Sequence, residues 1–195
     1  MGYSIEAGTE GCYEGTTCLI NKFDIRDEKK LSNIEAAITF AKASELEKTP
    51  IKGKFDLKHY LAIHRFLFED IYDWAGELRT VEISKKGTTF ANTAELETLC
   101  ISCFERLKKL NYFKELDFPE FVENIVDLYC VTNKIHPFRE GNGRTQRIFI
   151  SQLIRYNGYD IDFSKIDTDE LMIATIHSAS GIRDYLTDIF TKHIK

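Results

Sequence analysis

The stretch that decides the fold is residues 135–147, which read I-H-P-F-R-E-G-N-G-R-T-Q-R. Apolar residues recur at helical spacing before it, over 121–131, and after it, over 148–156. The stretch is therefore predicted to connect two helices. Its two glycines and the asparagine between them favour left-handed backbone, and they bring N–H groups close to a ligand where the second helix starts.

Charged side chains in this connector predict an anion site. Arg144 and Arg147 are three residues apart and lie on one side of the first helical turn. Two guanidiniums, backbone amides and the positive end of a helix favour phosphate groups. His136 is a base that titrates near neutral pH, and Glu140 offers the hard oxygen that Mg²⁺ prefers. A simple capped turn flanked by arginines is the structural alternative.

The connector resembles the signature of Fic proteins, H-x-F-x-D/E-G-N-G-R-x-x-R. A second stretch, residues 67–79 with the sequence L-F-E-D-I-Y-D-W-A-G-E-L-R, resembles a segment that lies upstream in the same family. The resemblance extends from Cys18 onward. Every fixed position of the signature is filled here, by His136, Phe138, Glu140, Gly141, Asn142, Gly143, Arg144 and Arg147.

The residues favour group transfer from a nucleoside triphosphate to a protein hydroxyl. A hydroxyl is a poor nucleophile at neutral pH, so it needs a positioned base, and His136 has a suitable intrinsic pKa. Glu140 holding Mg²⁺, together with Arg144 and Arg147, would stabilise the charge of the phosphates as the leaving group departs.

The rest of the connector has supporting roles. The backbone amides of Gly141 and Gly143, with the amide and side chain of Asn142, are expected to cradle the phosphate under attack. Phe138 is apolar among polar neighbours, so it is expected to anchor the loop in the core.

The family resemblance implies the reaction. Complete signatures go with attack at the α-phosphate, so the chain is expected to be a protein adenylyltransferase that moves AMP from ATP to a Ser, Thr or Tyr hydroxyl. Arg147 would then meet the γ-phosphate and Arg144 the neighbouring phosphate. Relatives with altered signatures transfer phosphate, UMP or phosphocholine, and a nucleotide-binding module without turnover is a further alternative. A metal-dependent hydrolase is disfavoured because the loop has only one carboxylate.

Bulk properties agree with one compact domain over residues 1–195. The chain has 195 residues with 43% hydrophobic content, which is enough for a sizeable core. A net charge of −5 argues against nonspecific binding to nucleic acid or to acidic membranes. Five cysteines, an odd number, favour free thiols in a reducing cytosol. No leader and no apolar run of membrane-spanning length is found in the sequence.

Periodicity and capping signals predict a mostly α bundle of about seven helices with one β-hairpin. Residues 1–22 are polar and Gly-rich, so they are expected to form an irregular lead-in. Ser32 and Glu35 form a capping box for a helix over 33–46, with inward residues Ile34, Ala37, Ile38 and Ala41. Further helices are expected from Asp56 to Phe68, from Thr93, from Asp117 to the signature, from the signature to Asn157, and over 169–179 and 181–192.

The hairpin is predicted over residues 80–91, where Val81 and Ile83 alternate with polar neighbours. It is either a simple connector or an exposed strand edge that pairs with a segment of another protein. The resemblance favours the second interpretation, because Fic proteins have a hairpin flap here that holds the target. Ser84 and Lys85 would belong to the same docking edge.

Because the signature is complete, the enzyme would modify hydroxyl groups whenever ATP is present. Its activity is therefore expected to be inhibited by some mechanism. Fic relatives use an inhibitory helix with the pattern S/T-x-x-x-E-G/N, and this pattern is absent from the chain. The resemblance to toxin–antitoxin members therefore implies a small inhibitory partner that docks beside the N-terminal helices. A poorly disposed ATP or another internal segment is the alternative.

Overall fold

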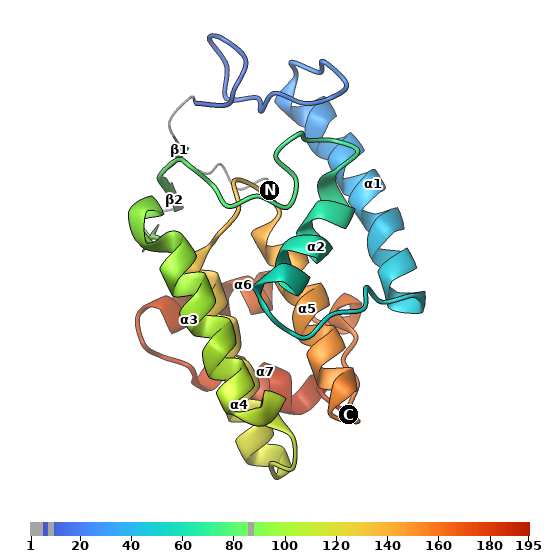
Figure 1. Cartoon of the computed structure of the whole chain (residues 1–195), viewed down its shortest axis with the longest axis vertical. Helices are drawn as coiled ribbons and strands as arrows, with labels where there is room; N and C mark the ends of the chain where they lie inside the picture. Colours follow the sequence, from blue (N-terminus) through green and yellow to red (C-terminus); the bar gives the residue numbers. More distant parts are fainter. Residues whose placement is uncertain (1–5, 8–9, 86–87) are drawn as a thin grey trace.

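The computed structural model describes residues 6–7, 10–85 and 88–195. Within these ranges the chain forms seven α-helices and one three-stranded sheet (Figure 1), which confirms the predicted mostly α bundle. The helices are α1 (Glu28–Lys48), α2 (Leu57–Phe68), α3 (Leu96–Lys109), α4 (Phe118–Ile135), α5 (Asn142–Tyr156), α6 (Thr168–Ala179) and α7 (Asp184–His193). The strands are β1 (Glu6–Ala7), β2 (Ile83–Lys85) and β3 (Thr88–Thr89).

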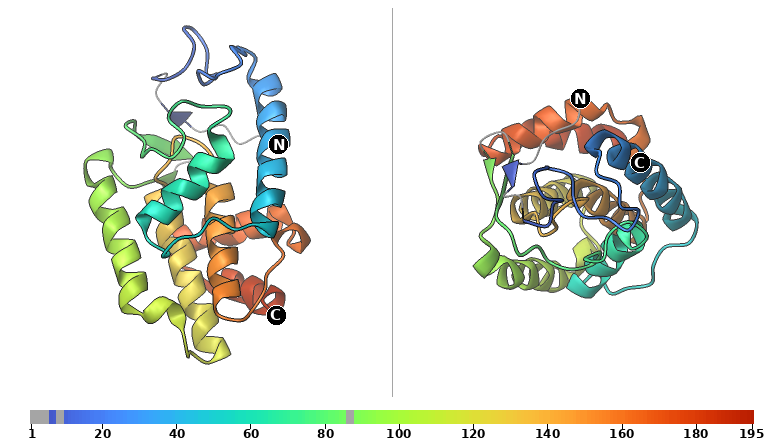
Figure 2. Two further views of the ribbon diagram at one scale, coloured as in Figure 1. Left: turned by 45° about the vertical axis from the view of Figure 1, so that its right-hand side comes forward. Right: turned by 90° about the horizontal axis from the view of Figure 1, so that it is seen from above.

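The two helices that flank the signature, α4 and α5, form the centre of the bundle (Figure 2). α5 packs on α2 and α4, and α4 also packs on α3 and α7. The buried Gln146 of α5 donates hydrogen bonds to Tyr129 O at 2.8 Å and to Thr132 Oγ1 at 2.7 Å, both in α4. These bonds fix α5 against α4, so the connector between the two helices has a rigid frame on both sides.

Most predicted helix starts are found where the capping residues stand. Asp56 accepts the His59 N–H at the start of α2, and Asp117 accepts the Glu120 N–H at the start of α4. Thr93 is one exception, because Asn92 is the capping residue there and a short 3₁₀ turn precedes α3.

The first helix is longer than its sequence predicts. α1 begins at Glu28, where the Asp27 carboxylate accepts the N–H of Lys30 at 2.9 Å. The predicted capping box of Ser32 and Glu35 is therefore wrong, because both residues lie inside the helix.

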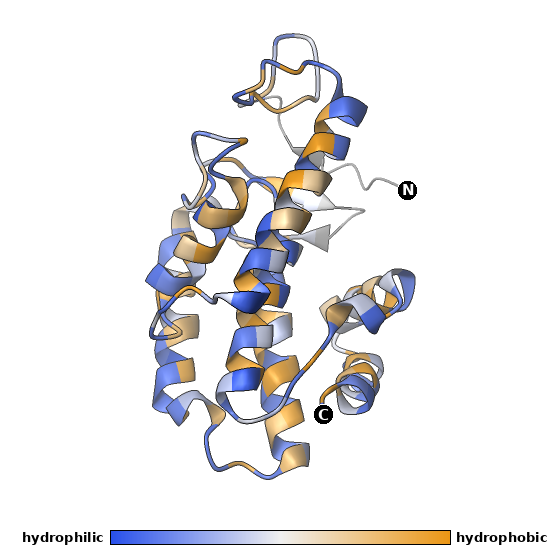
Figure 3. Ribbon diagram, turned by 90° about the vertical axis from the view of Figure 1, so that its right-hand side faces the viewer, coloured by the Kyte–Doolittle hydropathy of each residue, from blue (hydrophilic) through white to orange (hydrophobic). Residues whose placement is uncertain are grey.

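The inward face of α1 is also different from the prediction. The buried residues of α1 are Leu31, Glu35, Thr39 and Leu46. Polar groups can be buried here because they contact a partly buried arginine of α5, as shown below. The apolar residues that were predicted to point inward are exposed or only half-buried: Ile34, Ala37, Ile38 and Ala41. Figure 3 shows α1 facing the viewer, with apolar and polar residues along its exposed length.

The predicted hairpin over 80–91 is present as β2 and β3, which pair antiparallel; residues 86–87 between them lie outside the described ranges. The outer edge of β2 is not exposed, because β1 pairs with it. In this structure β1 therefore occupies the edge, and the prediction that a target pairs there stays a prediction. The registers are Ser84 opposite Thr89, Lys85 opposite Thr88, Glu6 opposite Ser84 and Ala7 opposite Ile83.

The state of the cysteines and the search for membrane-spanning helices can also be compared with the structure. All five cysteines are free thiols, and burial raises the pKa of both Cys100 and Cys103 to about 12. Across the part of the chain that the structure describes, no helix combines the length and the apolar character needed to cross a membrane.

Candidate active site

The signature forms a tight loop between α4 and α5, and Asn142 closes it. Its Oδ1 accepts the Phe138 N–H at 2.8 Å, and its Nδ2 donates to the Phe138 carbonyl at 2.7 Å. Both polar ends of the Asn142 side chain are thus engaged within the loop. The expected contact of this side chain with a phosphate stays a prediction, and the structure shows that the side chain also closes the loop. Phe138 itself is fully buried, as a loop anchor must be.

Gly141 turns the backbone into α5 with a φ of +80°. A Cβ at this position would lie 2.2 Å from Cζ of Phe68, so both the turn and the packing require glycine. Its N–H donates to Glu140 Oε1 at 2.8 Å, so this amide braces the metal-ligating carboxylate that the sequence predicts. The next amides belong to the first turn of α5, where helical geometry provides no partner for N–H groups.

His136 ends α4 in a left-handed conformation, with a φ of +49°. Its Nδ1 lies 3.2 Å from the Asn133 carbonyl oxygen. A carbonyl only accepts hydrogen bonds, so Nδ1 carries the proton and the lone pair is on Nε2. Phe90, which follows β3, stacks on the imidazole with ring centroids 3.8 Å apart and planes 16° apart. The geometry gives His136 the tautomer that a general base requires.

A second histidine, His64 of α2, contacts the signature loop through a hydrogen bond and a ring stack. The Gly76 N–H donates to its Nδ1 at 2.8 Å, so Nε2 carries the proton and donates to the Glu140 carbonyl at 3.0 Å. The ring stacks on Phe138 with centroids 3.7 Å apart. Burial lowers the pKa of His64 to about 3, so the ring is neutral at physiological pH. His64 is therefore a buried core histidine with both ring nitrogens hydrogen-bonded.

The two signature arginines have different surroundings. Arg144 Nη2 lies 2.5 Å from Glu35 Oε1 and 3.1 Å from Glu140 Oε1, and Nη1 donates to Thr39 Oγ1 at 3.0 Å. Tyr72 donates to the other oxygen of Glu35 at 2.5 Å. Burial opposes the positive charge, but the two carboxylates outweigh it and raise the pKa of Arg144. Arg144 is therefore held by α1 and by Glu140.

Arg147 is half-buried and, among the residues that the structure describes, it has neither an ion pair nor a hydrogen bond. Burial lowers its pKa, and the positive charge of Arg144 lowers it further. Its Nη1 lies 3.2 Å from the place that a Cβ on Gly143 would take, so glycine leaves room for the guanidinium. An incompletely hydrated cation at a helix N-terminus is a favourable place for an anion.

The site fits Mg²⁺ as an ion bound by one carboxylate together with phosphate oxygens of the substrate. Within the described ranges, no group of three or more His, Cys, Asp or Glu side chains could hold a metal ion. Mg²⁺ is usually bound through one or two carboxylates together with phosphate oxygens of a substrate. Glu140, whose side chain is 32% exposed, fits this arrangement as the single carboxylate of the loop.

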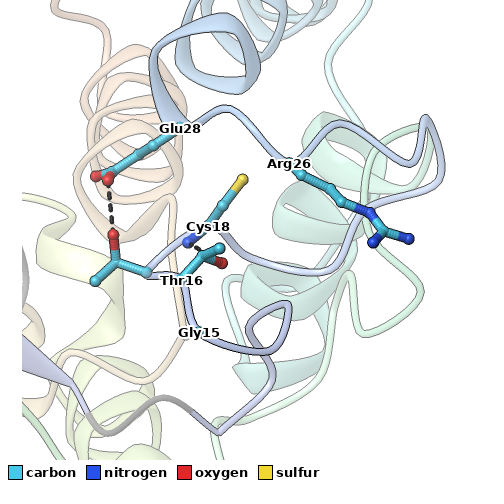
Figure 4. A pocket seen from close by; sticks show the side chains of 6 residues that line it. Gly15, Thr16, Cys18, Arg26 and Glu28 are labelled. Atoms are coloured by element: carbon cyan, nitrogen blue, oxygen red, sulfur yellow. Dashed lines mark hydrogen bonds between the residues drawn. The ribbon is translucent and has the colours of Figure 1, made fainter.

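A separate hollow lies in the lead-in (Figure 4), and it holds none of the signature residues. Thr17 Oγ1 donates to Glu28 at 2.8 Å across it, and the Cys18 N–H donates to Thr16 Oγ1 at 3.2 Å. The first bond fixes the lead-in to the start of α1, and the second lies within the lead-in. The hollow is lined by Gly15, Thr16, Thr17, Cys18, Arg26 and Glu28.

Sequence patterns missed several residues of the site. Glu35 was assigned to a helix cap, although Glu35 and Thr39 are four residues apart and share a helix face. This spacing of two polar residues is the sequence signal that could have identified Glu35 and Thr39 as residues of the site. Tyr72 and Phe90 reach the site through tertiary packing that leaves no local pattern. Arg79, at the end of the upstream segment, is described below.

Comparisons with known proteins agree on one family. The sequence model of the Fic/DOC family matches residues 54–154. Protein adenylyltransferase VbhT of Bartonella schoenbuchensis is 36% identical over 179 residues, which is 92% of this chain and 37% of that protein. Probable protein adenylyltransferase Fic of Escherichia coli is 34% identical over 181 residues, 92% of this chain and 89% of that protein.

Solved structures show the same fold. The crystal structure of the BepC protein of Bartonella tribocorum, with bound AMPPNP, superposes with a TM-score of 0.88 at 28% identity, over 96% of this chain and 97% of that chain. This chain thus spans nearly all of one matching structure, but only 37% of the length of VbhT.

Proposed function

The chain belongs to the Fic/DOC family, and we propose that it is a protein adenylyltransferase that transfers AMP from ATP to a hydroxyl group of a target protein. The relatives described above are named for this activity, and one related structure contains an ATP analogue. The observation that carries the proposal is the contrast between the two arginines. Arg144 is bound by Glu35 and Glu140, whereas Arg147 has no anionic partner among the described residues and is available to bind a phosphate of the nucleotide.

The residues of the loop divide the chemistry between them. Nε2 of His136 takes the proton of the target hydroxyl. The hydroxyl oxygen forms a bond to the α-phosphorus, and the bond from that phosphorus to the bridging oxygen breaks. The electron pair leaves with pyrophosphate, whose charge Arg147 stabilises. Mg²⁺ bound at Glu140 would add positive charge beside the phosphates.

The direct test uses the purified chain with ATP and Mg²⁺. Mass spectrometry of the chain itself, and of proteins in a bacterial lysate added to it, should detect adducts of the mass of AMP. Pyrophosphate should appear in the same amount as the adduct. Adducts of the mass of a phosphate group would contradict the proposal, and binding of ATP without any adduct would favour the non-catalytic alternative.

The hairpin over 80–91 is proposed to dock the target. Val81 and Ile83 are buried with Phe90 in a small cluster, so a target would have to bind this segment through its main chain. A target segment would take the place of β1 on the outer edge of β2. It would then lie beside Phe90, which covers the imidazole of the base.

Replacing Ser84 with proline should reduce target modification by at least tenfold, because proline removes a main-chain N–H from the strand. ATP affinity, measured by calorimetry, should change by less than about threefold, since nucleotide and flap are on different elements. Ser84→Ala is the matched control and should leave both quantities near wild type. Equal loss of modification and ATP affinity in Ser84→Pro would show that the hairpin is only structural.

Restraint in trans is proposed for the same enzyme. Phe40 is 76% exposed and Ile34 is 37% exposed on the outer face of α1, while Glu35 and Thr39 of the same helix reach Arg144. A small inhibitory partner that covers these apolar residues would bind the outer side of α1, the helix whose inner side contacts Arg144.

Expression of the chain alone should slow bacterial growth, and co-expression with the adjacent small open reading frame should restore it. Phe40→Asp in the chain should weaken that rescue, because a charge would oppose apolar docking. Two results would contradict this model: toxicity that no neighbouring gene product relieves, or a purified chain that becomes active only after its own terminus is cut.

A further inference from the structure

The guanidinium of Arg79 holds three segments of the chain together. Its Nε donates to the His136 carbonyl at 2.9 Å, its Nη1 donates to the Val81 carbonyl at 2.8 Å, and its Nη2 donates to the Ala91 carbonyl. Its side chain is fully buried. One side chain thus contacts the main chain of the proposed base and both ends of the flap.

The backbone repeats the same connections. The Arg79 N–H donates to the Pro137 carbonyl at 2.8 Å, and the Ala91 N–H donates to the Lys134 carbonyl at 3.1 Å. The upstream segment and the far end of the flap are therefore both attached to the end of α4. The arginine lies where these attachments meet.

Three fixed carbonyl acceptors explain why the residue is arginine. Its planar fork presents donors in several directions at once, whereas lysine has a single compact ammonium group. Burial lowers the pKa of Arg79, and Glu82 opposes that effect. Glu82 lies 3.6 Å away with a side chain 57% exposed, so it is a weak partner and the carbonyl groups carry most of the stabilisation.

The arrangement also reaches the reactive ring. Ala91 follows Phe90 directly, so the bond from Arg79 to the Ala91 carbonyl fixes the backbone beside the ring that stacks on His136. The bond to the His136 carbonyl fixes the left-handed residue that carries the imidazole. The backbone beside the Phe90 ring and the backbone of His136 are therefore both fixed by the same guanidinium.

We propose that Arg79 is a positioning residue that joins the flap and the base into one unit, so that a target strand paired with the flap brings its hydroxyl to Nε2 of His136. This role rests on the proposed function, because it concerns the transfer step. It separates Arg79 from the nucleotide-binding residues, since none of its bonds in the described part of the chain reaches 140–147.

Arg79→Lys tests the proposal, because it keeps the charge and removes the fork. The rate of AMP transfer to protein should fall about a hundredfold, the cost of a displacement of about 1 Å at a reacting centre. ATP affinity should stay within about threefold of wild type. Arg106→Lys is the control, since Arg106 is an exposed partner of Asp127 outside the site, and it should leave all readouts unchanged.

Amide hydrogen exchange gives a readout that needs no turnover. Exchange in residues 80–91 should rise at least tenfold in Arg79→Lys, while exchange in the central helix α5 should stay slow. This separates failure of the clamp from failure of the proposed function: a wild-type chain without transfer activity would contradict the function, and unchanged exchange in Arg79→Lys would contradict the clamp.

Phe90→Leu provides a second variant in case Arg79→Lys does not fold. It removes the ring that stacks on His136 and leaves every bond of Arg79 in place. AMP transfer should again fall while ATP affinity is kept. Wild-type transfer in Arg79→Lys, or a loss of ATP affinity parallel to the loss of transfer, would overturn the proposal.

Discussion

Replacing His136 with alanine should reduce AMP transfer by about 10²- to 10⁴-fold or more, while ATP binding stays close to wild type. The reason is that Nδ1 carries the proton and donates to Asn133, so Nε2 is the only ring nitrogen with a lone pair for the hydroxyl proton. The measurement is the single-turnover rate of adduct formation at saturating ATP, with ATP affinity measured separately by calorimetry.

The backbone conformation of His136 calls for a second variant. Alanine in the left-handed region costs about 1 kcal/mol, and asparagine tolerates that region better. His136→Asn should therefore be as inactive as His136→Ala but closer to wild type in thermal stability. Transfer within threefold of wild type in either variant would show that His136 is not the base.

Replacing Glu140 with alanine should remove both transfer activity and its dependence on Mg²⁺. Loss of a group that only supports a metal ligand typically costs 10- to 100-fold in metal affinity, so loss of the ligand itself should cost at least that much. The Gly141 N–H and Arg144 would also lose an acceptor. ATP affinity should be titrated with and without Mg²⁺.

Two further substitutions separate the metal from the loop. Glu140→Gln keeps an oxygen that can accept the bonds from Gly141 and Arg144 but has no charge, so the loop should stay folded and the Mg²⁺ effect should vanish. Glu140→Asp keeps the charge, which the signature permits, and should retain measurable transfer. Full Mg²⁺-dependent activity in Glu140→Gln would show that this carboxylate is not the metal ligand.

Local signals predicted most of the fold. The N-caps at Asp56 and Asp117 and the Gly141 turn act through hydrogen bonds to near neighbours in sequence, so the sequence alone contains their information. The face of α1 could not be predicted in this way. Its orientation depends on a partly buried ion pair between Glu35 and Arg144, which lies 109 positions away in the sequence.

The candidate site was predictable in its reactive residues and less so in its supports. The motif identifies His136 and Glu140, because few residue types can act as a base near neutral pH or as a ligand of Mg²⁺. The bonds of Asn142 to Phe138 and the pairing of β1 with β2 depend on the final geometry of loop and strand. For the same reason, the role of Arg79 becomes visible only once the carbonyl groups of three segments are in place.

The position of the radioactive label is the most direct test of the central claim, which is attack at the α-phosphate. The chain is incubated with Mg²⁺ and a protein lysate, in parallel with ATP labelled at the α-phosphate and with ATP labelled at the γ-phosphate. His136→Ala serves as the blank. AMP transfer predicts covalent label on protein from α-labelled ATP and none from γ-labelled ATP. Label from γ-labelled ATP alone would contradict AMP transfer and assign the same site to phosphoryl transfer.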